Sequence, residues 1–84
     1  AVLIDVRESH EYKNFHAPGA KLISLGVLER RLKEIPSERE ILVVCQSGMR
    51  SSQAAGILSK NGYQVKNVAG GMAAWQRAGL KVVR

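Results

Sequence analysis

The amino-acid sequence predicts a three-layer α/β/α domain, in which helices cover both faces of a small central parallel sheet of four to five strands. Strand-like runs alternate with helical patterns along the chain, which is typical of βαβ units. The strand-like run nearest the N-terminus is mostly apolar without alternation, as expected of a strand covered on both faces. With 84 residues, of which 45% are hydrophobic, residues 1–84 are expected to fold as a single domain.

The first third of the chain predicts two strands joined by a brief helix and a turn. A β-branched, apolar run at 2–6 is the first strand. Ser9 is a favourable N-cap, so a short helix is expected over 10–14. Proline and glycine mark a turn over 16–20, and the second strand follows at 21–24.

The middle of the chain predicts a longer helix and then the central strand of the sheet. From Leu25 to Ile35, apolar residues recur at steps of three and four, which places them on one face of an α-helix that Pro36 stops. The run at 41–44 is entirely apolar, so we expect this strand at the centre of the sheet.

The last third repeats the order of helix and strand. An Ala-rich helix is predicted over 51–60, with the Asn-Gly pair at 61–62 as its stop, and a strand follows at 64–68. A short helix over 72–78 ends at a glycine and leads to an extended tail at 80–83. In open parallel sheets, ligands bind outside the carboxyl ends of the strands, so residues just after each strand are candidate site residues.

The charge of the chain narrows the class of partner. Thirteen Lys and Arg against seven Asp and Glu give a formal net charge of +6, which favours small anions or acidic partners. The basic residues are scattered and aromatic residues make up only 5% of the chain, whereas nucleic-acid binding typically needs a basic stripe with stacking rings. We therefore expect no nucleic-acid binding.

Cysteine content and hydropathy exclude two further classes of protein. The single cysteine, Cys45, cannot form an internal disulfide or a multi-thiolate site, and the two histidines lack ligand spacing with it, so no metal is predicted. No apolar stretch approaches the ~18–20 residues that cross a bilayer, so no membrane association is expected. The expected location is cytoplasmic. Because the chain starts at Ala1 without methionine, a processed exported form or a piece of a longer chain is the alternative.

Cys45 is the strongest candidate for a catalytic residue. It comes directly after the apolar strand at 41–44 and opens a loop that ends at Arg50, where a helical pattern begins. Backbone N–H groups of such a loop, and the positive end of the following helix, stabilise an anionic sulfur. We therefore expect a lowered pKa for the Cys45 thiol and a thiolate nucleophile at neutral pH.

The length of this loop distinguishes between two thiolate chemistries. Phosphatases that act through a thiolate have five residues between cysteine and arginine, so that N–H groups can surround a tetrahedral phosphate. Only four residues separate Cys45 from Arg50, and Val44 stands where those phosphatases usually carry histidine. The smaller ring suits a single sulfur atom bound to Cys45, that is, a persulfide. A small phosphatase or arsenate reductase on the same fold is the less favoured alternative.

Four segments carry motifs in a recognisable order: Leu3-Ile4-Asp5-Val6-Arg7-Glu8, then Glu11-Tyr12 with His16–Ala20, then Cys45–Ser51, and finally Asn67–Trp75. Together they resemble the single-domain rhodaneses, a family of sulfurtransferases, and the resemblance covers nearly all of the chain. It implies a rhodanese-like fold without metal or organic cofactor. Because the family's domain usually begins with more sequence before the Asp-Val-Arg strand, the chain is expected to lack the usual N-terminal extension and an outer strand.

The resemblance also implies a reaction. A donor such as thiosulfate, mercaptopyruvate, polysulfide or a persulfide gives a sulfane sulfur to Cys45, and cyanide or a thiol accepts it. Backbone N–H groups from Gln46 to Arg50 would hold the bound sulfur, Gly48 would permit the turn, and Arg50 would stabilise the loop or bind the donor's anionic end. The expected partners are a small anionic sulfur donor and a thiol or cyanide acceptor, with a protein donor or acceptor as a further option. The chain is expected to be a monomer.

Other residues are expected to support the site or to control access to it. Asp5 and Arg7 lie at a strand end, where a structural ion pair is favoured over a catalytic role. His16 is expected to anchor its loop by a hydrogen bond, because sulfur transfer to a thiolate needs no base. Ser51 completes the family's loop motif. The residues expected to project from the loop and to set donor access are Gln46, Ser47 and Met49.

Two departures from the family pattern bear on the substrate. Gln46 stands where many thiosulfate-using members carry a basic residue, so thiosulfate is expected to be a poor donor. Phe15 stands where the family has glycine, and its ring would narrow the pocket if it bordered it. A non-enzymatic sulfur carrier or protein-interaction module of the same fold is therefore the principal alternative to an enzyme.

Overall fold

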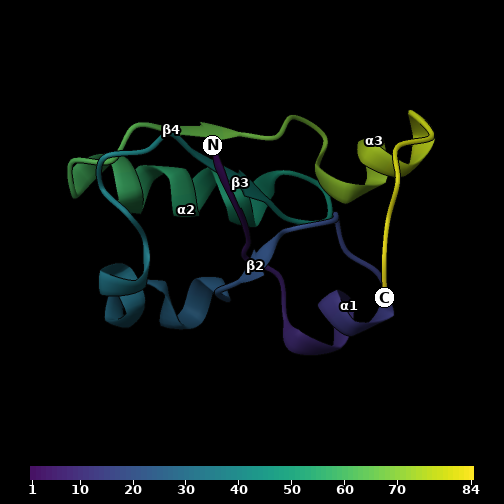
Figure 1. Cartoon of the computed structure of the whole chain (residues 1–84), viewed down its shortest axis with the longest axis horizontal. Helices are drawn as coiled ribbons and strands as arrows, with labels where there is room; N and C mark the ends of the chain where they lie inside the picture. The colour runs from purple at the N-terminus through teal and green to yellow at the C-terminus, as the bar shows by residue number, and fades with distance from the viewer.

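The computed structural model describes residues 1–84, with four strands and four helical segments (Figure 1). Their order is β1 (Val2–Asp5), α1 (Ser9–Asn14), β2 (Lys21–Leu22), η1 (Leu25–Glu34), β3 (Ile41–Val44), α2 (Met49–Lys60), β4 (Val65–Asn67) and α3 (Gly71–Arg77). No helix is long and apolar enough to span a membrane.

The four strands form one parallel sheet in the order β2-β1-β3-β4. The central pair is β1 and β3, with Val2 opposite Ile41 and Asp5 opposite Val44. This pairing confirms that the apolar run at 41–44 lies at the centre of the sheet. Because all strands are parallel, the residues that follow them meet at one edge.

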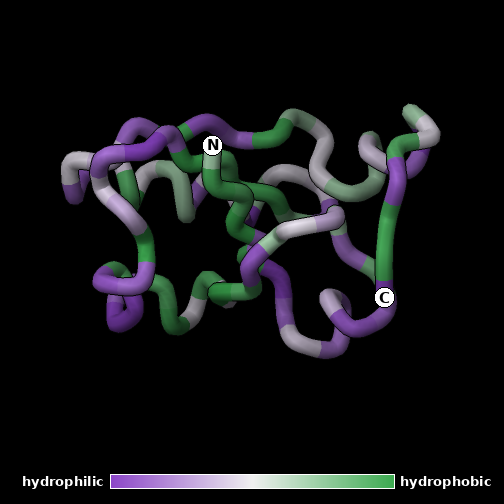
Figure 2. The backbone as a smooth tube through the Cα atoms, viewed as in Figure 1, coloured by the Kyte–Doolittle hydropathy of each residue, from purple (hydrophilic) through white to green (hydrophobic).

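Apolar side chains pack on both faces of the sheet and form two separate clusters. On one face, Ile4 and Val43 pack with Leu28 of η1 and Leu58 of α2, and all four are fully buried. On the other face, Val44 packs with Met72 of α3 and with partly buried side chains that include Tyr12 of α1 and Trp75 of α3. The predicted three-layer α/β/α arrangement is therefore confirmed, and Figure 2 shows the hydrophobic colour following β1 from the N-terminus into the centre of the molecule.

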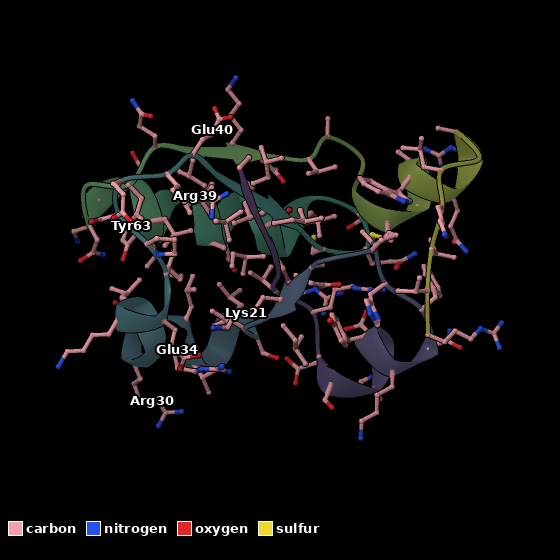
Figure 3. The ribbon with its side chains drawn as sticks, viewed as in Figure 1. Lys21, Arg30, Glu34, Arg39, Glu40 and Tyr63 are labelled. Carbon is pink, nitrogen blue, oxygen red and sulfur yellow. The ribbon has the colours of Figure 1, made fainter.

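The segment over 25–35, predicted as an α-helix, is instead a 3-10 helix, η1, with non-helical backbone at Arg31. A long-range contact holds the end of this segment, because the Tyr63 hydroxyl lies 2.9 Å from the Leu32 oxygen and 3.0 Å from the Ile35 oxygen. These carbonyls are thereby satisfied from outside the helix. Figure 3 shows Tyr63 near this segment, with Lys21 beside Glu34, and the Lys21 Nζ–Glu34 Oε1 distance is 3.3 Å.

The N-cap of α1 also differs from the prediction. Ser9 is the first helical residue and Glu8 is the N-cap. The Glu8 N–H donates to the Glu11 carboxylate at 3.0 Å, so Glu11, three residues later in the chain, supplies the acceptor that the N-cap N–H lacks in the helix.

Several predicted bounds shift by one or two residues. The strands are shorter than predicted at 2–6, 21–24 and 64–68, and the helix predicted over 51–60 begins at Met49. The expected tail at 80–83 crosses from α3 to α1, where Val83 and His16 exchange two backbone hydrogen bonds of 2.8 Å (Figure 1). This crossing holds the C-terminal segment against the α1 side of the molecule.

Candidate active site at Cys45

Cys45 follows β3 directly and opens the loop that leads into α2. The start of α3, which follows β4, is hydrogen-bonded to this loop. The Met72 N–H donates to the Cys45 oxygen at 2.8 Å, and the Ala73 N–H donates to the Gln46 oxygen at 3.0 Å. The first turn of a helix has unpaired N–H groups, and here the loop carbonyls accept two of them. The backbone of Cys45 and Gln46 is therefore fixed by hydrogen bonds from α3.

The Cys45 sulfur lies in a cradle of hydrogen-bond donors. Its residue is only 1% exposed, the Gly48 N–H donates to Sγ at 3.0 Å, and the Ser51 hydroxyl lies 3.3 Å from Sγ. Burial raises the pKa of the thiol, but hydrogen bonds from the Ser51 hydroxyl and from the backbone N–H groups of Ser51, Gly48 and Ser47 outweigh it, so the pKa of Cys45 is lowered. The geometry thus favours a thiolate.

The shape of the cradle depends on Gly48. Its φ is +104°, in the left-handed region that glycine adopts without strain, and it is the N-cap of α2. This conformation turns the Gly48 N–H toward the sulfur and starts the helix immediately afterwards. At the outer side of the loop, Ser47 is exposed and Met49 is 78% exposed, whereas Gln46 and Arg50 are half-buried.

Arg50 points to α1, not to the sulfur. Its Nη1 and Nη2 donate to the two carboxylate oxygens of Glu11 at 2.6 and 2.9 Å. The hydrogen bond from Arg50 lowers the pKa of Glu11 to about 2, and the same bond raises the pKa of Arg50. Of the two roles predicted for Arg50, this bidentate pair corresponds to stabilisation of the loop.

We expect the pair between Glu11 and Arg50 to make the stability of the protein acid-sensitive. Because the pKa of Glu11 falls from 4.5 to about 2 in the folded protein, its contribution is present above pH 4.5 and is lost as pH falls toward 2. Glu11→Gln should reduce the free energy of unfolding at pH 7 by about 1–2 kcal/mol. It should also flatten the decline of stability with pH over that window, measured by urea denaturation at several pH values. Equal declines in both proteins would contradict the assignment.

Asp5 and Arg7 form the ion pair that the sequence predicts. Both are buried, and Arg7 Nη2 lies 2.9 Å from Asp5 Oδ2. The same guanidinium donates to the Phe15 oxygen at 2.7 Å and to Gln46 Oε1 at 3.3 Å, so it links three segments. It also lies 5.2 Å from the centre of the Phe15 ring, within cation–π range. Phe15 packs against the second apolar cluster, so the ring supports Arg7 and is a packing residue.

His16 anchors its loop, as predicted. Its Nδ1 lies 2.8 Å from the Tyr12 oxygen, and its ring stacks on the Tyr12 ring with centroids 3.7 Å apart. Both of these contacts are with α1, and the backbone of His16 also binds Val83 of the C-terminal segment. No group of three or more His, Cys, Asp or Glu side chains that could hold a metal ion converges in the structure.

Sequence reasoning missed two residues of this site, Glu11 and Asn67. The Ser51 hydroxyl lies 2.5 Å from Asn67 Oδ1, and Asn67 Nδ2 donates to the Gly48 oxygen at 3.2 Å. Asn67 is the last residue of β4, so the rule that directed attention to Cys45, a polar residue at the carboxyl end of a strand, also applies to it. Glu11 lies on a helix, and only its place in a family motif distinguished it.

Comparisons with known proteins give a consistent result. The profile of the Rhodanese-like domain family matches residues 1–78. A protein of Allochromatium vinosum named "Sulfurtransferase" is 37% identical over 98% of this chain and 78% of its own length. A Bacillus subtilis protein named as a candidate sulfur carrier, YrkF, is 43% identical over 87% of this chain, which spans 40% of that protein. The crystal structure of a rhodanese-related protein from Thermoplasma volcanium superposes with a TM-score of 0.94 at 29% identity, over 98% of this chain and 82% of that one.

Proposed function

Because this chain belongs to the rhodanese-like domain family, we propose that it is a sulfurtransferase that carries a sulfane sulfur on Cys45. The single observation that supports the proposal best is the cradle, in which the Gly48 N–H and the Ser51 hydroxyl both lie within hydrogen-bond range of a buried sulfur. Donors placed in this way stabilise the thiolate before reaction and the charge that develops during it.

The first half of the proposed cycle loads the sulfur. The Cys45 thiolate attacks the outer sulfur of thiosulfate, the sulfur–sulfur bond of the donor breaks, and sulfite leaves with the electron pair. A persulfide anion remains on Cys45, so total charge is conserved and no external oxidant is needed. With a polysulfide or a low-molecular-weight persulfide, the leaving group is the shortened polysulfide or a thiolate.

The second half transfers the sulfur to an acceptor. Cyanide or a thiolate attacks the outer sulfur of the persulfide, the bond between the two sulfur atoms breaks, and the Cys45 thiolate leaves. A leaving group of lowered pKa departs more readily, so the hydrogen bonds that lower the pKa of Cys45 assist this step as well.

Kinetics with two substrates test this cycle. Because the donor product leaves before the acceptor binds, varying thiosulfate or polysulfide at several cyanide concentrations should give parallel double-reciprocal plots. Intersecting plots would indicate a complex of both substrates with the protein and would contradict a free persulfide intermediate.

Gln46 is the residue that we propose to limit the use of thiosulfate. Its amide is neutral and accepts a hydrogen bond from Arg7, so it offers a dianionic donor no charge of its own. Gln46→Arg should lower KM for thiosulfate about fivefold, which corresponds to ~1 kcal/mol for one added charge at a half-exposed position. The gain should shrink at high salt. The matched control is Gln46→Met, which has similar length and no charge, and an unchanged KM in Gln46→Arg would contradict the proposal.

A second candidate function is transfer of sulfur between proteins, with slow turnover on small donors. It is favoured by the similarity to a candidate sulfur carrier and by the exposure of Met49, which is 78% exposed on the outer side of the loop. A surface loop of this kind can meet a protein thiol directly. Faster loading of Cys45 from a persulfidated protein than from free thiosulfate would support this function, and equal or slower loading would favour the small-molecule enzyme.

A further inference from the structure

One side chain outside the loop contacts two of the residues whose donors reach the Cys45 sulfur. Asn67 lies at the end of β4, with its Nδ2 3.2 Å from the Gly48 oxygen and its Oδ1 2.5 Å from the Ser51 hydroxyl. The Gly48 N–H donates to the sulfur at 3.0 Å, and the Ser51 hydroxyl lies 3.3 Å from it. Asn67 is therefore placed to influence the sulfur without touching it.

The orientation of the Asn67 amide follows from its two contacts. The Gly48 carbonyl can only accept, so the NH2 group of Asn67 faces it and the amide oxygen faces Ser51. The Ser51 hydroxyl has one hydrogen and two acceptors within reach, Asn67 Oδ1 and Cys45 Sγ. Ser51 is fully buried, so water does not supply a third acceptor at comparable range.

The choice between these acceptors depends on the charge of the sulfur. An ionised acceptor forms a hydrogen bond roughly twice as strong as a neutral one, so a thiolate attracts the Ser51 hydrogen. A neutral inner sulfur, as in the thiol or the persulfide, releases the hydrogen to the short contact with Asn67. Moving the hydrogen from one acceptor to the other needs only rotation of the Ser51 hydroxyl, and no covalent bond is broken.

We propose that Asn67 is a positioning residue that competes with the Cys45 sulfur for the Ser51 hydroxyl hydrogen and thereby limits how strongly the thiolate is stabilised. Its use in turnover rests on the proposed function, because negative charge leaves Sγ when the persulfide forms and returns when the sulfur departs. A thiolate that is hydrogen-bonded less strongly is the better nucleophile, so the competition favours loading.

The charged groups near the site lie on other side chains. Arg50 on α2, whose charge interacts with Cys45 and with Glu8, is paired with Glu11 of α1. Asp5, the last residue of β1, is paired with Arg7. Asn67 and Ser51 are neutral, so replacing either with alanine leaves this set of charges unchanged. A shift in thiol titration in such variants therefore reports on hydrogen bonding.

The test is the pH dependence of Cys45 alkylation by iodoacetamide, which needs no sulfur donor and is independent of whether the protein transfers sulfur. Asn67→Ala frees the hydroxyl for the thiolate, so the alkylation curve should move to lower pH by about half a unit, and the plateau rate should fall. Ser51→Ala should move the curve to higher pH. In the Ser51→Ala background, Asn67→Ala should have no effect.

A third variant gives a shift of the opposite sign. Asn67→Asp offers the hydroxyl a charged acceptor and should move the curve to higher pH, and part of that shift should persist in the Ser51→Ala background because a carboxylate also acts through its charge. Far-UV circular dichroism and urea denaturation confirm that each variant is folded. The proposal is overturned if Asn67→Ala leaves the curve unchanged, moves it to higher pH, or shifts it equally with and without the Ser51 hydroxyl.

Discussion

Replacing Cys45 with serine is expected to lower sulfur transfer from any donor to cyanide to the uncatalysed rate, a loss of at least about a thousandfold. Serine preserves the size of the side chain and can accept the same hydrogen bond from the Gly48 N–H. Its hydroxyl, however, is not ionised at neutral pH and has little affinity for sulfane sulfur. The measurement is the initial rate of thiocyanate formation with thiosulfate and with polysulfide.

A matched control separates this effect from a general effect of substitution. Ser59 is exposed near the end of α2, and its side chain makes no hydrogen bond, so Ser59→Ala should keep the wild-type rate. Retention of more than a few per cent of the activity in Cys45→Ser would show that another group carries the sulfur.

The second large effect is expected at Gly71, where α3 approaches the loop most closely. Its φ is +59°, and a Cβ at this position would lie 2.6 Å from the Gln46 oxygen. Gly71→Ala should therefore strain the backbone and push α3 away, which weakens the bonds from the Met72 and Ala73 N–H groups. Together these terms should lower the free energy of unfolding by about 2–4 kcal/mol.

Gly56 provides the matched control, because it lies inside α2, where an added methyl group would meet no atom of another segment within 4 Å. Gly56→Ala should raise the free energy of unfolding by about 0.5–1 kcal/mol, since alanine favours a helix interior. Urea denaturation measures both changes. If Gly71→Ala were as stable as the wild type, α3 would not hold the loop in the way described.

The sequence predicts the sheet and the place of Cys45 well, because both depend on local patterns. The run at 41–44 is entirely apolar, which predicts a strand that is covered on both faces. The polar loop that follows it then lies at the carboxyl edge of the parallel sheet. Steps of three and four between apolar residues do not distinguish an α-helix from the 3-10 helix η1. The contacts of Tyr63 at the end of η1 are with Leu32 and Ile35, which lie 31 and 28 positions before it in the chain, so a local pattern does not predict them.

The parts of the site that the sequence did not predict are contacts between distant segments. Glu11 and Arg50 are 39 positions apart, and Asn67 and Ser51 are 16 apart. Each of these side chains is an ordinary polar residue in its own segment, and only the packing of α1 and β4 against the loop gives it a partner. Phe15 and Gln46, the two departures from the family pattern, likewise share a distant partner, because both contact Arg7.

The most direct test of the central claim is the intact mass of the wild-type protein after incubation with thiosulfate or polysulfide and removal of excess donor. We expect a gain of one sulfur atom, loss of that atom on addition of cyanide, and no gain in Cys45→Ser. A wild-type mass that stays unchanged with every donor, including a persulfidated protein, would contradict the account that Cys45 carries a sulfane sulfur.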